Sequence, residues 1–408
     1  MPVLKNISFL ATCRDEGGQG DLHAIRDAAL VWDDSQITWV GREADLPEGY
    51  MGTDELDAGG RLVIPGLVDC HTHLAFAGWR TEEFVQRALG KSYLEIAQSG
   101  GGIMRTVRLT RETDAQILLK HCRGVLDQMV ELGVTAVECK SGYGLDFETE
   151  LKILSVYRVL KGSHPVRIAS TYLGAHVVPV EFRDDRSGYL DLVCREVIPA
   201  VAKADLAVFC DVFVEESAFS LGEARQVFEA GHEHGLRPKV HADQLSPGGG
   251  AELAAEVGAV SADHLEYVSD AGIEKMAAAG TVAVALPLAS LYLNQTPLQV
   301  RRLINGGVRV AVATDFNPGS SPSFHLPLGM TLLCVGSQMT PAEALKAATI
   351  YAAKAMGMNG ITGSIEEGKL ADFAIIDAPE PDHWLYHFRP NACFGTFVGG
   401  RQVWGQEA

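Results

Sequence analysis

Two histidines separated by a single residue, His71 and His73, follow directly on the apolar segment 62–70. The end of this segment reads as a short buried strand that begins after Pro65 and Gly66. Side chains alternate along a strand, so both imidazoles point to the same side, about 7 Å apart at ~3.3 Å per residue. Imidazole is a good ligand for zinc, iron, nickel and copper. The pair therefore predicts a metal site, against the alternative that it merely caps a strand.

Further residues that can bind metal stand where other predicted strands end. His241 lies in the stretch 240–243, His264 in 262–264 and Asp315 in 313–315. Taken singly, such a histidine is usually a hydrogen-bonded structural residue and such an aspartate a helix cap. Together with His71 and His73 they form a set that chance explains poorly. We expect these side chains to meet in one place.

The elements that must position these residues alternate between strand-like and helical patterns. Eight strand-like segments are found, at residues 67–71, 134–140, 166–172, 206–214, 238–242, 260–265, 281–286 and 308–314. Helical patterns separate or follow them, at residues 114–132, 148–161, 221–234, 249–257, 270–279 and 341–356. This alternation predicts an α/β fold, a (β/α)8 TIM-like barrel over residues 65–360, with its active site at the carboxyl ends of the strands.

The two ends of the chain have a different character. Residues 1–64 and 361–408 read as short strands and turns, including a hairpin formed by 29–32 and 37–41. Neither piece carries enough alternating apolar surface to close a core alone. We expect the two ends to pair into one small β-sandwich domain.

The composition restricts the class of protein. The chain has 408 residues, 47% of them hydrophobic, and a formal charge of -18, so phosphate backbones and anionic membranes are repelled. A nucleic-acid or membrane partner is therefore not expected. The N-terminus does not resemble a secretory signal, and no run of 18 uncharged apolar residues occurs. The 8 cysteines are scattered without a C-x-x-C, which favours reduced thiols and a cytoplasmic location.

The segment 62–73 resembles the first barrel strand of the metal-dependent amidohydrolase superfamily, in which the H-x-H pair supplies two metal ligands. The resemblance and the ligand chemistry together imply one zinc or iron ion per chain, held by His71, His73, His241 and Asp315. A net charge of about +1 at such a site favours ionisation of a bound water. Asp315 would accept the proton, and His264 would polarise the substrate carbonyl. A second metal would need a bridging glutamate such as Glu215, and we favour a single ion.

Five stretches narrow the resemblance to the imidazolonepropionase family: residues 71–80, 100–103, 138–145, 173–176 and 314–321. This similarity implies hydrolysis of the cyclic amide C-N bond of 4-imidazolone-5-propanoate to N-formimidoyl-L-glutamate, a step of histidine degradation. The attacking group would be a metal-bound hydroxide. The substrate would be a small organic anion.

An anionic substrate on an acidic protein needs a local cation. Arg80, seven residues after His73, offers a guanidinium that can bind the propanoate group, although an exposed loop arginine is the plain alternative. The resemblance assigns further substrate contacts to Tyr143, His176, Asn317, Gly319 and Ser320. Gln244 falls at a position where this family has Glu or Gln. The resemblance therefore predicts both a substrate-binding and a catalytic role for Gln244. A neutral amide cannot take up a proton, so we expect Gln244 to orient the ring and leave proton transfer to Asp315 and His264.

Two other functions remain open at this point. A guanine- or cytosine-type deaminase would keep the barrel and the metal, but its neutral base would leave Arg80 without a carboxylate to bind. A barrel without catalytic activity, acting as a binding protein, would be expected to lack some ligands, whereas every ligand position is filled here. The superfamily resemblance also allows a homodimer.

Overall fold

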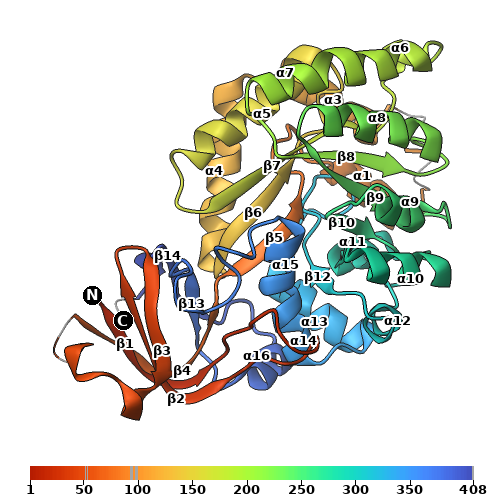
Figure 1. Ribbon diagram of the computed structural model, residues 1–408. Helices are drawn as coiled ribbons and strands as arrows, with labels where there is room; N and C mark the ends of the chain where they lie inside the picture. Colours follow the sequence, from red (N-terminus) through yellow and green to blue (C-terminus); the bar gives the residue numbers. More distant parts are fainter. Residues whose placement is uncertain (51, 53, 92–94, 97–99, 407–408) are drawn as a thin grey trace.

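The computed structural model describes residues 1–50, 52, 54–91, 95–96 and 100–406, and it contains two separate sheets (Figure 1). The larger sheet has eight parallel strands in chain order. They are β5 (Leu67–Thr72), β6 (Val134–Lys140), β7 (Arg167–Ala175), β8 (Phe209–Val214), β9 (Arg237–Ala242), β10 (Ser261–His264), β11 (Val282–Ala285) and β12 (Val310–Val312). The predicted (β/α)8 barrel is confirmed, and each predicted strand overlaps one observed strand.

The barrel closes where β12 and the loop after it meet β5. The backbone N–H of Asp315 donates to His71 O at 3.0 Å, and that of His73 donates to Phe316 O at 2.9 Å. The buried carboxylate of Asp69 accepts from the backbone N–H of Thr314 at 3.1 Å and from its hydroxyl at 2.6 Å. This seam places the first and last predicted ligands side by side.

The helices that the sequence predicts begin at strong N-caps. Asp114, Asp146, Ser220 and Ser269 each accept a hydrogen bond from a backbone N–H of the first turn. The helices that they begin cover the outside of the barrel (Figure 1). They are α4 (Ala115–Glu131), α5 (Phe147–Lys161), α8 (Leu221–Glu233) and α10 (Asp270–Ala279), and α9 (Gly250–Glu256) lies beside α10.

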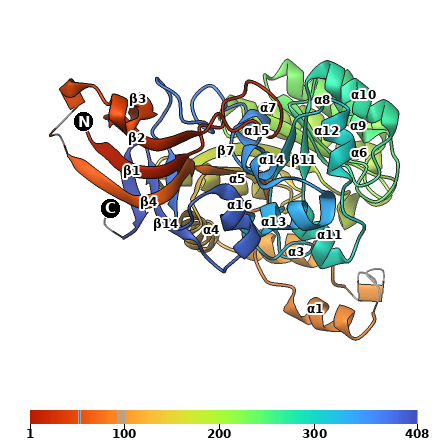
Figure 2. The same ribbon diagram turned by 90° about the horizontal axis from the view of Figure 1, so that it is seen from below.

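Several helices were not predicted, and most of them are only six to eight residues long. The structure adds α1 (Thr81–Ala88), α3 (Ile103–Glu112), α6 (Arg186–Asp191), α7 (Ile198–Lys203), α11 (Pro287–Leu293), α12 (Val300–Asn305), α13 (Leu326–Ser337) and α16 (Pro381–His387). A π-helical segment, η4 (Leu192–Val197), joins α6 to α7, and 3-10 turns occur at η1 (Glu43–Asp45), η2 (Glu48–Tyr50) and η3 (Val180–Phe182). Helix α1 projects away from the barrel (Figure 2).

The predicted helix at residues 341–356 is wrong in one respect, because it is two helices. They are α14 (Pro341–Ala347), which begins at the predicted Thr340–Glu343 capping box, and α15 (Ile350–Ala355). Thr349 has φ -129° and ψ -99°, so the helix cannot continue through it. The break frees the carbonyl of Ala348, which accepts a hydrogen bond from Val68 N on β5 at 2.8 Å. Tertiary contact with the barrel thus outweighs the local helical preference.

The smaller sheet joins both ends of the chain, as predicted. Its order is β15-β14-β13-β4-β1-β2-β3. The strands are β1 (Val3–Leu10), β2 (Ile25–Asp33), β3 (Gln36–Arg42), β4 (Glu55–Pro65), β13 (Phe373–Ile376), β14 (Cys393–Val398) and β15 (Arg401–Gly405). In a flat sheet, β2 and β13 would lie about 14 Å apart, at ~4.8 Å per strand. The rings of Trp32 and Phe373 are instead 5.2 Å apart, so the sheet folds over its own core like a sandwich.

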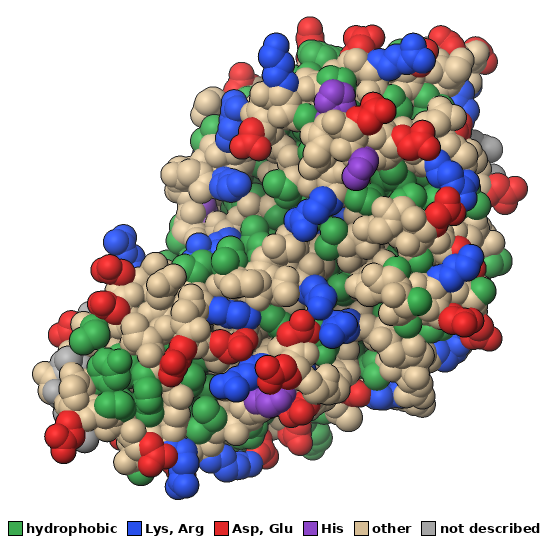
Figure 3. All heavy atoms as spheres, viewed as in Figure 1, with side chains coloured by type: hydrophobic (Ala, Val, Ile, Leu, Met, Phe, Trp, Pro, Cys, Tyr) green, Lys and Arg blue, Asp and Glu red, His purple; other side chains and the backbone are tan. Residues whose placement is uncertain are grey.

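The surface of the molecule carries charged side chains of both signs (Figure 3). Lys and Arg side chains are interspersed with Asp and Glu over the face seen in Figure 3. Among the described residues, every helix is too short or too polar to cross a bilayer. The division of the chain near residues 65 and 360 stays a prediction.

Candidate metal centre and active site

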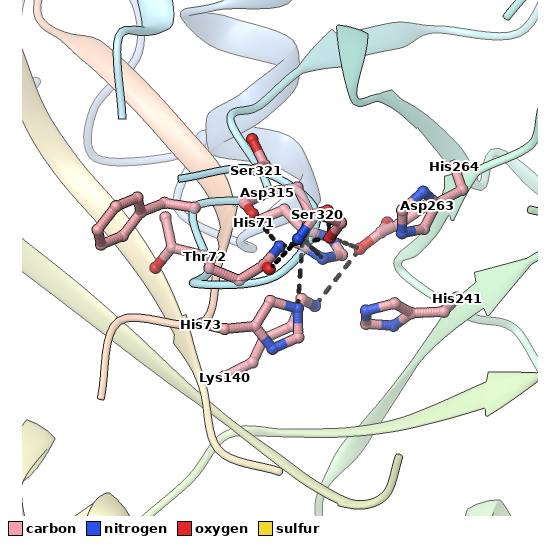
Figure 4. Close-up of polar contacts among 12 residues, drawn as sticks. His71, Thr72, His73, Lys140, His241, Asp263, His264, Asp315, Ser320 and Ser321 are labelled. Carbon is pink, nitrogen blue, oxygen red and sulfur yellow. Dashed lines mark hydrogen bonds and ion pairs between the residues drawn. The ribbon is translucent and has the colours of Figure 1, made fainter. Parts of the chain in front are cut away.

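The structure brings the four predicted metal ligands together at the carboxyl end of the barrel strands (Figure 4). Oδ1 of Asp315 lies 3.5 Å from Nε2 of His71 and 3.4 Å from Nε2 of His73. The ring of His241 is 4.6 Å from that of His71, centroid to centroid. Two triads have ligand atoms within 4.8 Å of one another, namely His71 with His73 and Asp315, and His71 with His241 and His264.

The donor atoms of this cluster fit a metal ion. Nε2 of His71 and Nε2 of His241 are buried and make no hydrogen bond with any described residue. Buried polar atoms are rarely left without a partner, and a metal ion would supply one. Burial lowers the pKa of His73 to about 3 and lowers the pKa values of His71 and His241 well below their usual range. The three imidazoles are therefore neutral, which is the form that binds metal.

Two buried carboxylates orient these histidines. Nδ1 of His71 lies 2.6 Å from Oδ2 of Asp263, and Nδ1 of His241 lies 3.1 Å from Oδ1 of Asp211. A carboxylate on Nδ1 fixes the tautomer and directs Nε2 to the metal. The sequence reasoning assigned no role to Asp211 or Asp263. Asp211 could have been found as a charged residue within the apolar strand Phe209–Val214.

Lys140 lies behind the same two histidines. Its ammonium is fully buried and contacts Asp211, Glu138 and Asp263. Burial by itself would lower the pKa of Lys140, but the charges of these three carboxylates outweigh it and raise the pKa. Lys140 is therefore held as an ammonium paired with carboxylates, which argues against a role as a metal ligand.

His264 and Asp315 are the predicted proton-handling residues. The ring of His264 is 5.4 Å from that of His241, and its backbone φ of 79° turns the chain back at the strand end. Burial raises the pKa of Asp315 to about 6. Glu266, which the sequence reasoning did not consider, lies 3.9 Å from Nδ1 of His264, and burial raises its pKa to about 7.

Arg80 is a buried cation, and the described residues offer it no acidic partner. Its side chain donates from Nε to Thr106 Oγ1 at 2.9 Å, and the residue is only 8% exposed. Its guanidinium packs against Gly319, where a Cβ atom would lie 2.4 Å from Nη1. Within the described part of the chain, no carboxylate lies within 4.0 Å of this guanidinium. Because an unpaired buried charge is costly, this arrangement is typical of a site that receives an anion.

Tyr143 and His176 line the other side of the histidine cluster. The ring of His176 stacks on the ring of His73, with their centroids 5.3 Å apart. The centroid of the Tyr143 ring lies 5.8 Å from that of His73. Nδ1 of His176 lies 3.0 Å from Gly142 O. Gly142 has φ +99°, and a Cβ there would lie 2.8 Å from Leu173 O, so only glycine suits this turn. Both predicted residues therefore lie beside His73, one of the predicted metal ligands.

The loop after Asp315 is organised by Asn317. Its Oδ1 accepts from the backbone N–H groups of Gly319 and Ser320 at 2.8 Å, and its Nδ2 donates to Asp315 O at 2.6 Å and to Ser320 Oγ at 2.8 Å. Ser320 Oγ in turn lies 3.3 Å from Asp315 Oδ2. The polar atoms of Asn317 are thus taken up within the loop, and its contact with substrate stays a prediction.

Gln244 and Glu215 belong to the loop after β9 and to the end of β8. Gln244 is half-buried and makes no hydrogen bond with the residues that the structure describes. Glu215 accepts from Leu245 N at 2.9 Å and also binds the hydroxyl of Ser246. Both carboxylate oxygens of Glu215 hold this loop, which argues against a bridging role between two metals.

Comparison with known proteins places the fold and the site in a class. The chain matches the amidohydrolase family over residues 62–403. Solved structures of the same fold include the atrazine chlorohydrolase of Arthrobacter aurescens complexed with zinc (TM-score 0.73, 16% identity, 100% of this chain and 96% of that chain). Guanine deaminase of E. coli is another (TM-score 0.75, 14% identity, 100% of both chains). The chain is an amidohydrolase.

Relatives of higher sequence identity narrow this class. The imidazolonepropionase of Geobacillus thermodenitrificans is 47% identical and covers 94% of this chain and 91% of its own length. The imidazolonepropionase of Cupriavidus necator is 46% identical and covers 93% of this chain and 91% of its own length. The imidazolonepropionase of Colwellia psychrerythraea is 43% identical and covers 97% of this chain and 95% of its own length. Within the amidohydrolases, the chain belongs to the imidazolonepropionase family.

Proposed function

We propose that this protein hydrolyses the ring amide C-N bond of 4-imidazolone-5-propanoate and yields N-formimidoyl-L-glutamate, as a step of histidine degradation. The observation that carries the substrate assignment is the buried guanidinium of Arg80, which has no acidic partner among the described residues. It can bind the propanoate as a charge-assisted pair. The imidazolonepropionases that resemble this chain support the same substrate.

The proposed cofactor is one zinc or iron ion, with His71, His73, His241 and Asp315 as ligands. A metal ion bound there would supply Lewis acidity and lower the pKa of a water molecule. The imidazolones are small cyclic amides, so hydrolysis forms a bond from water oxygen to the ring carbonyl carbon. The C-N bond then breaks, the nitrogen takes a proton, and a single open product results.

The protein groups have separate tasks in this reaction. Asp315 takes the proton from the attacking water. His264 donates a hydrogen bond to the carbonyl oxygen as negative charge develops there. Arg80, Tyr143 and His176 hold the substrate, with Gly319 and Ser320 at its carboxylate side. Gln244 orients the ring through its amide.

The rival functions lack a supporting observation. A nucleobase is neutral and would leave the Arg80 guanidinium buried and unpaired, so the deaminase hypothesis explains the site less well. A barrel without catalysis does not explain the buried, neutral histidine cluster. We further propose a cytoplasmic enzyme, and a homodimer is compatible with it.

The test is loss of the imidazolone chromophore with purified protein that has been loaded with zinc or iron. We expect turnover that a chelator abolishes and that the added metal restores, without release of ammonia. Folded, metal-loaded protein that leaves the imidazolone intact would reject the proposal. Release of ammonia from guanine or cytosine would favour the deaminase instead.

A further inference from the structure

A cluster of charged side chains lies behind the histidines, closed off from solvent. Its members come from barrel strands β6, β8, β9 and β10, and each side chain is 0% exposed: Glu138, Lys140, Asp211, Lys239 and Asp263. Burying five charges costs free energy unless each charge is paired. We therefore expect this cluster to have a function. Three carboxylates face two ammonium groups.

Lys140 is the member that joins the two histidine-binding carboxylates. Its Nζ lies 2.7 Å from Oδ2 of Asp211 and 3.4 Å from Oδ2 of Asp263. Asp211 holds Nδ1 of His241, and Asp263 holds Nδ1 of His71. A single ammonium therefore lies one side chain away from both imidazoles (Figure 4).

We propose that Lys140 is a positioning residue that fixes the relative geometry of His71 and His241 by holding their two carboxylate partners together. The proposal rests on the proposed metal site.

Two carboxylates that share one cation repel each other once that cation is removed, and at low dielectric this repulsion is strong. The carboxylates would then separate and turn the imidazoles away from a common point. Affinity for metal would fall although every ligand is still present.

Lys239 provides a matched control within the same cluster. It is equally buried, and it binds Glu138 together with the carbonyls of Cys70 at 3.4 Å and Ala355 at 3.2 Å. Within the described structure it forms no ion pair with Asp211 or Asp263. Replacing Lys239 therefore removes a buried cation without releasing the carboxylates that hold the histidines.

The experiment compares Lys140→Met and Lys239→Met in the full chain. Metal-free protein is titrated with Zn²⁺ against a chromophoric chelator, and with Co²⁺ to record the visible spectrum that reports ligand geometry. We expect Lys140→Met to bind Zn²⁺ about 10- to 100-fold more weakly, the range found for loss of groups that orient metal ligands, with an altered Co²⁺ spectrum. Lys239→Met should bind within about threefold of wild type, with the wild-type spectrum.

Equal loss in both variants, or wild-type affinity in Lys140→Met, would overturn the proposal. If Lys140→Met does not fold, Asp211→Asn tests the same link from the other side, and wild-type Zn²⁺ affinity in that variant would overturn it too. Failure of the wild-type protein to bind either metal is a different result, because it rejects the proposed metal site itself.

Discussion

Arg80 is the residue that we propose to select an anionic substrate. Its guanidinium is buried against Gly319, four residues after Asp315, and Thr106 Oγ1 accepts from its Nε at 2.9 Å. The remaining nitrogens face no carboxylate within the described residues. Burial of the Arg80 guanidinium is unfavourable in the free protein. An anionic substrate would pair with it and remove that cost, so the burial favours binding of an anion.

Replacement of Arg80 by glutamine should therefore weaken substrate binding. A hydrogen bond to a charged group is worth about 1.5–3 kcal/mol, which corresponds to roughly a 10- to 100-fold rise in KM. Steady-state kinetics on the imidazolone measure this. Arg105→Gln is the control, because Arg105 forms a half-exposed pair with Glu82 at 3.0 Å and should keep the wild-type KM. An unchanged KM in Arg80→Gln would contradict the assignment.

Gly319 is predicted to be needed for the position of the guanidinium. A Cβ at Gly319 would lie 2.4 Å from Nη1 and 2.8 Å from Cζ of Arg80. The long arginine side chain can shift, so Gly319→Ala should raise KM about tenfold, a cost of ~1.4 kcal/mol, and leave the melting temperature nearly unchanged. Gly222→Ala, where nothing lies within 4 Å of a new Cβ, should leave KM unchanged. The reverse pattern, a lower melting temperature with normal KM, would show that the glycine serves the fold alone.

At the scale of elements, a charged side chain at the end of one helix can also bind a neighbouring helix. Glu223 completes the capping box of α8 with Ser220, and it also forms a two-point ion pair with Arg186 of α6. The hydrogen bonds from Arg186 and then those from Ser220 hold the pKa of Glu223 at about 2, below its usual 4.5. The ionised form is thus favoured in the folded state.

This linkage predicts a pH dependence of stability. A lowered pKa stabilises the fold above pH 4.5, and the contribution is lost as the pH falls toward 2. Because the pair is partly exposed, we expect Glu223→Gln to lower the free energy of unfolding by about 1 kcal/mol at pH 7. The difference from wild type should shrink at pH 3, as measured by urea unfolding. Glu229→Gln, on the exposed face of the same helix, should match wild type at both pH values.

At the scale of the whole molecule, the ion pair between Asp372 and Arg167 connects the terminal sheet with the barrel. Asp372, just before β13, is 1% exposed and binds Arg167 of β7 through two hydrogen bonds of 2.6 and 2.8 Å. The same carboxylate accepts from Thr362 Oγ1 at 2.9 Å and Gly399 N at 2.7 Å. Four donors from three separate segments thus converge on one side chain.

Asp372→Asn should consequently destabilise the protein without impairing the active site. Breaking a buried pair costs about 3–5 kcal/mol, and the partial exposure of Arg167 reduces this to about 2 kcal/mol. Urea unfolding gives the free energy, and kcat of the folded enzyme should stay as in wild type. Asp191→Asn breaks an exposed i,i+4 pair with Arg195 and should cost less than about 0.5 kcal/mol. Equal costs for the two variants would contradict the proposed role of Asp372.

The sequence by itself predicted the barrel, which is confirmed, and the four candidate metal ligands, which the structure brings together. Apolar strands bounded by glycine and proline mark the chain locally, and His71, His241 and Asp315 stand where such strands end. In a parallel barrel all strand ends meet at one face, so these residues could be placed together without coordinates. The pairing of the two termini followed from their shared strand pattern and their lack of a core.

Only the tertiary structure decided which buried charges support the site. Lys140 and Asp211 are 71 residues apart in sequence, and Asp263 and His71 are 192 apart. A charged residue in an apolar strand indicates a partner but does not identify it, because the partner depends on strand order and register. The break between α14 and α15 was equally hidden, since the hydrogen bond from Val68 to Ala348 exists only once the barrel has closed.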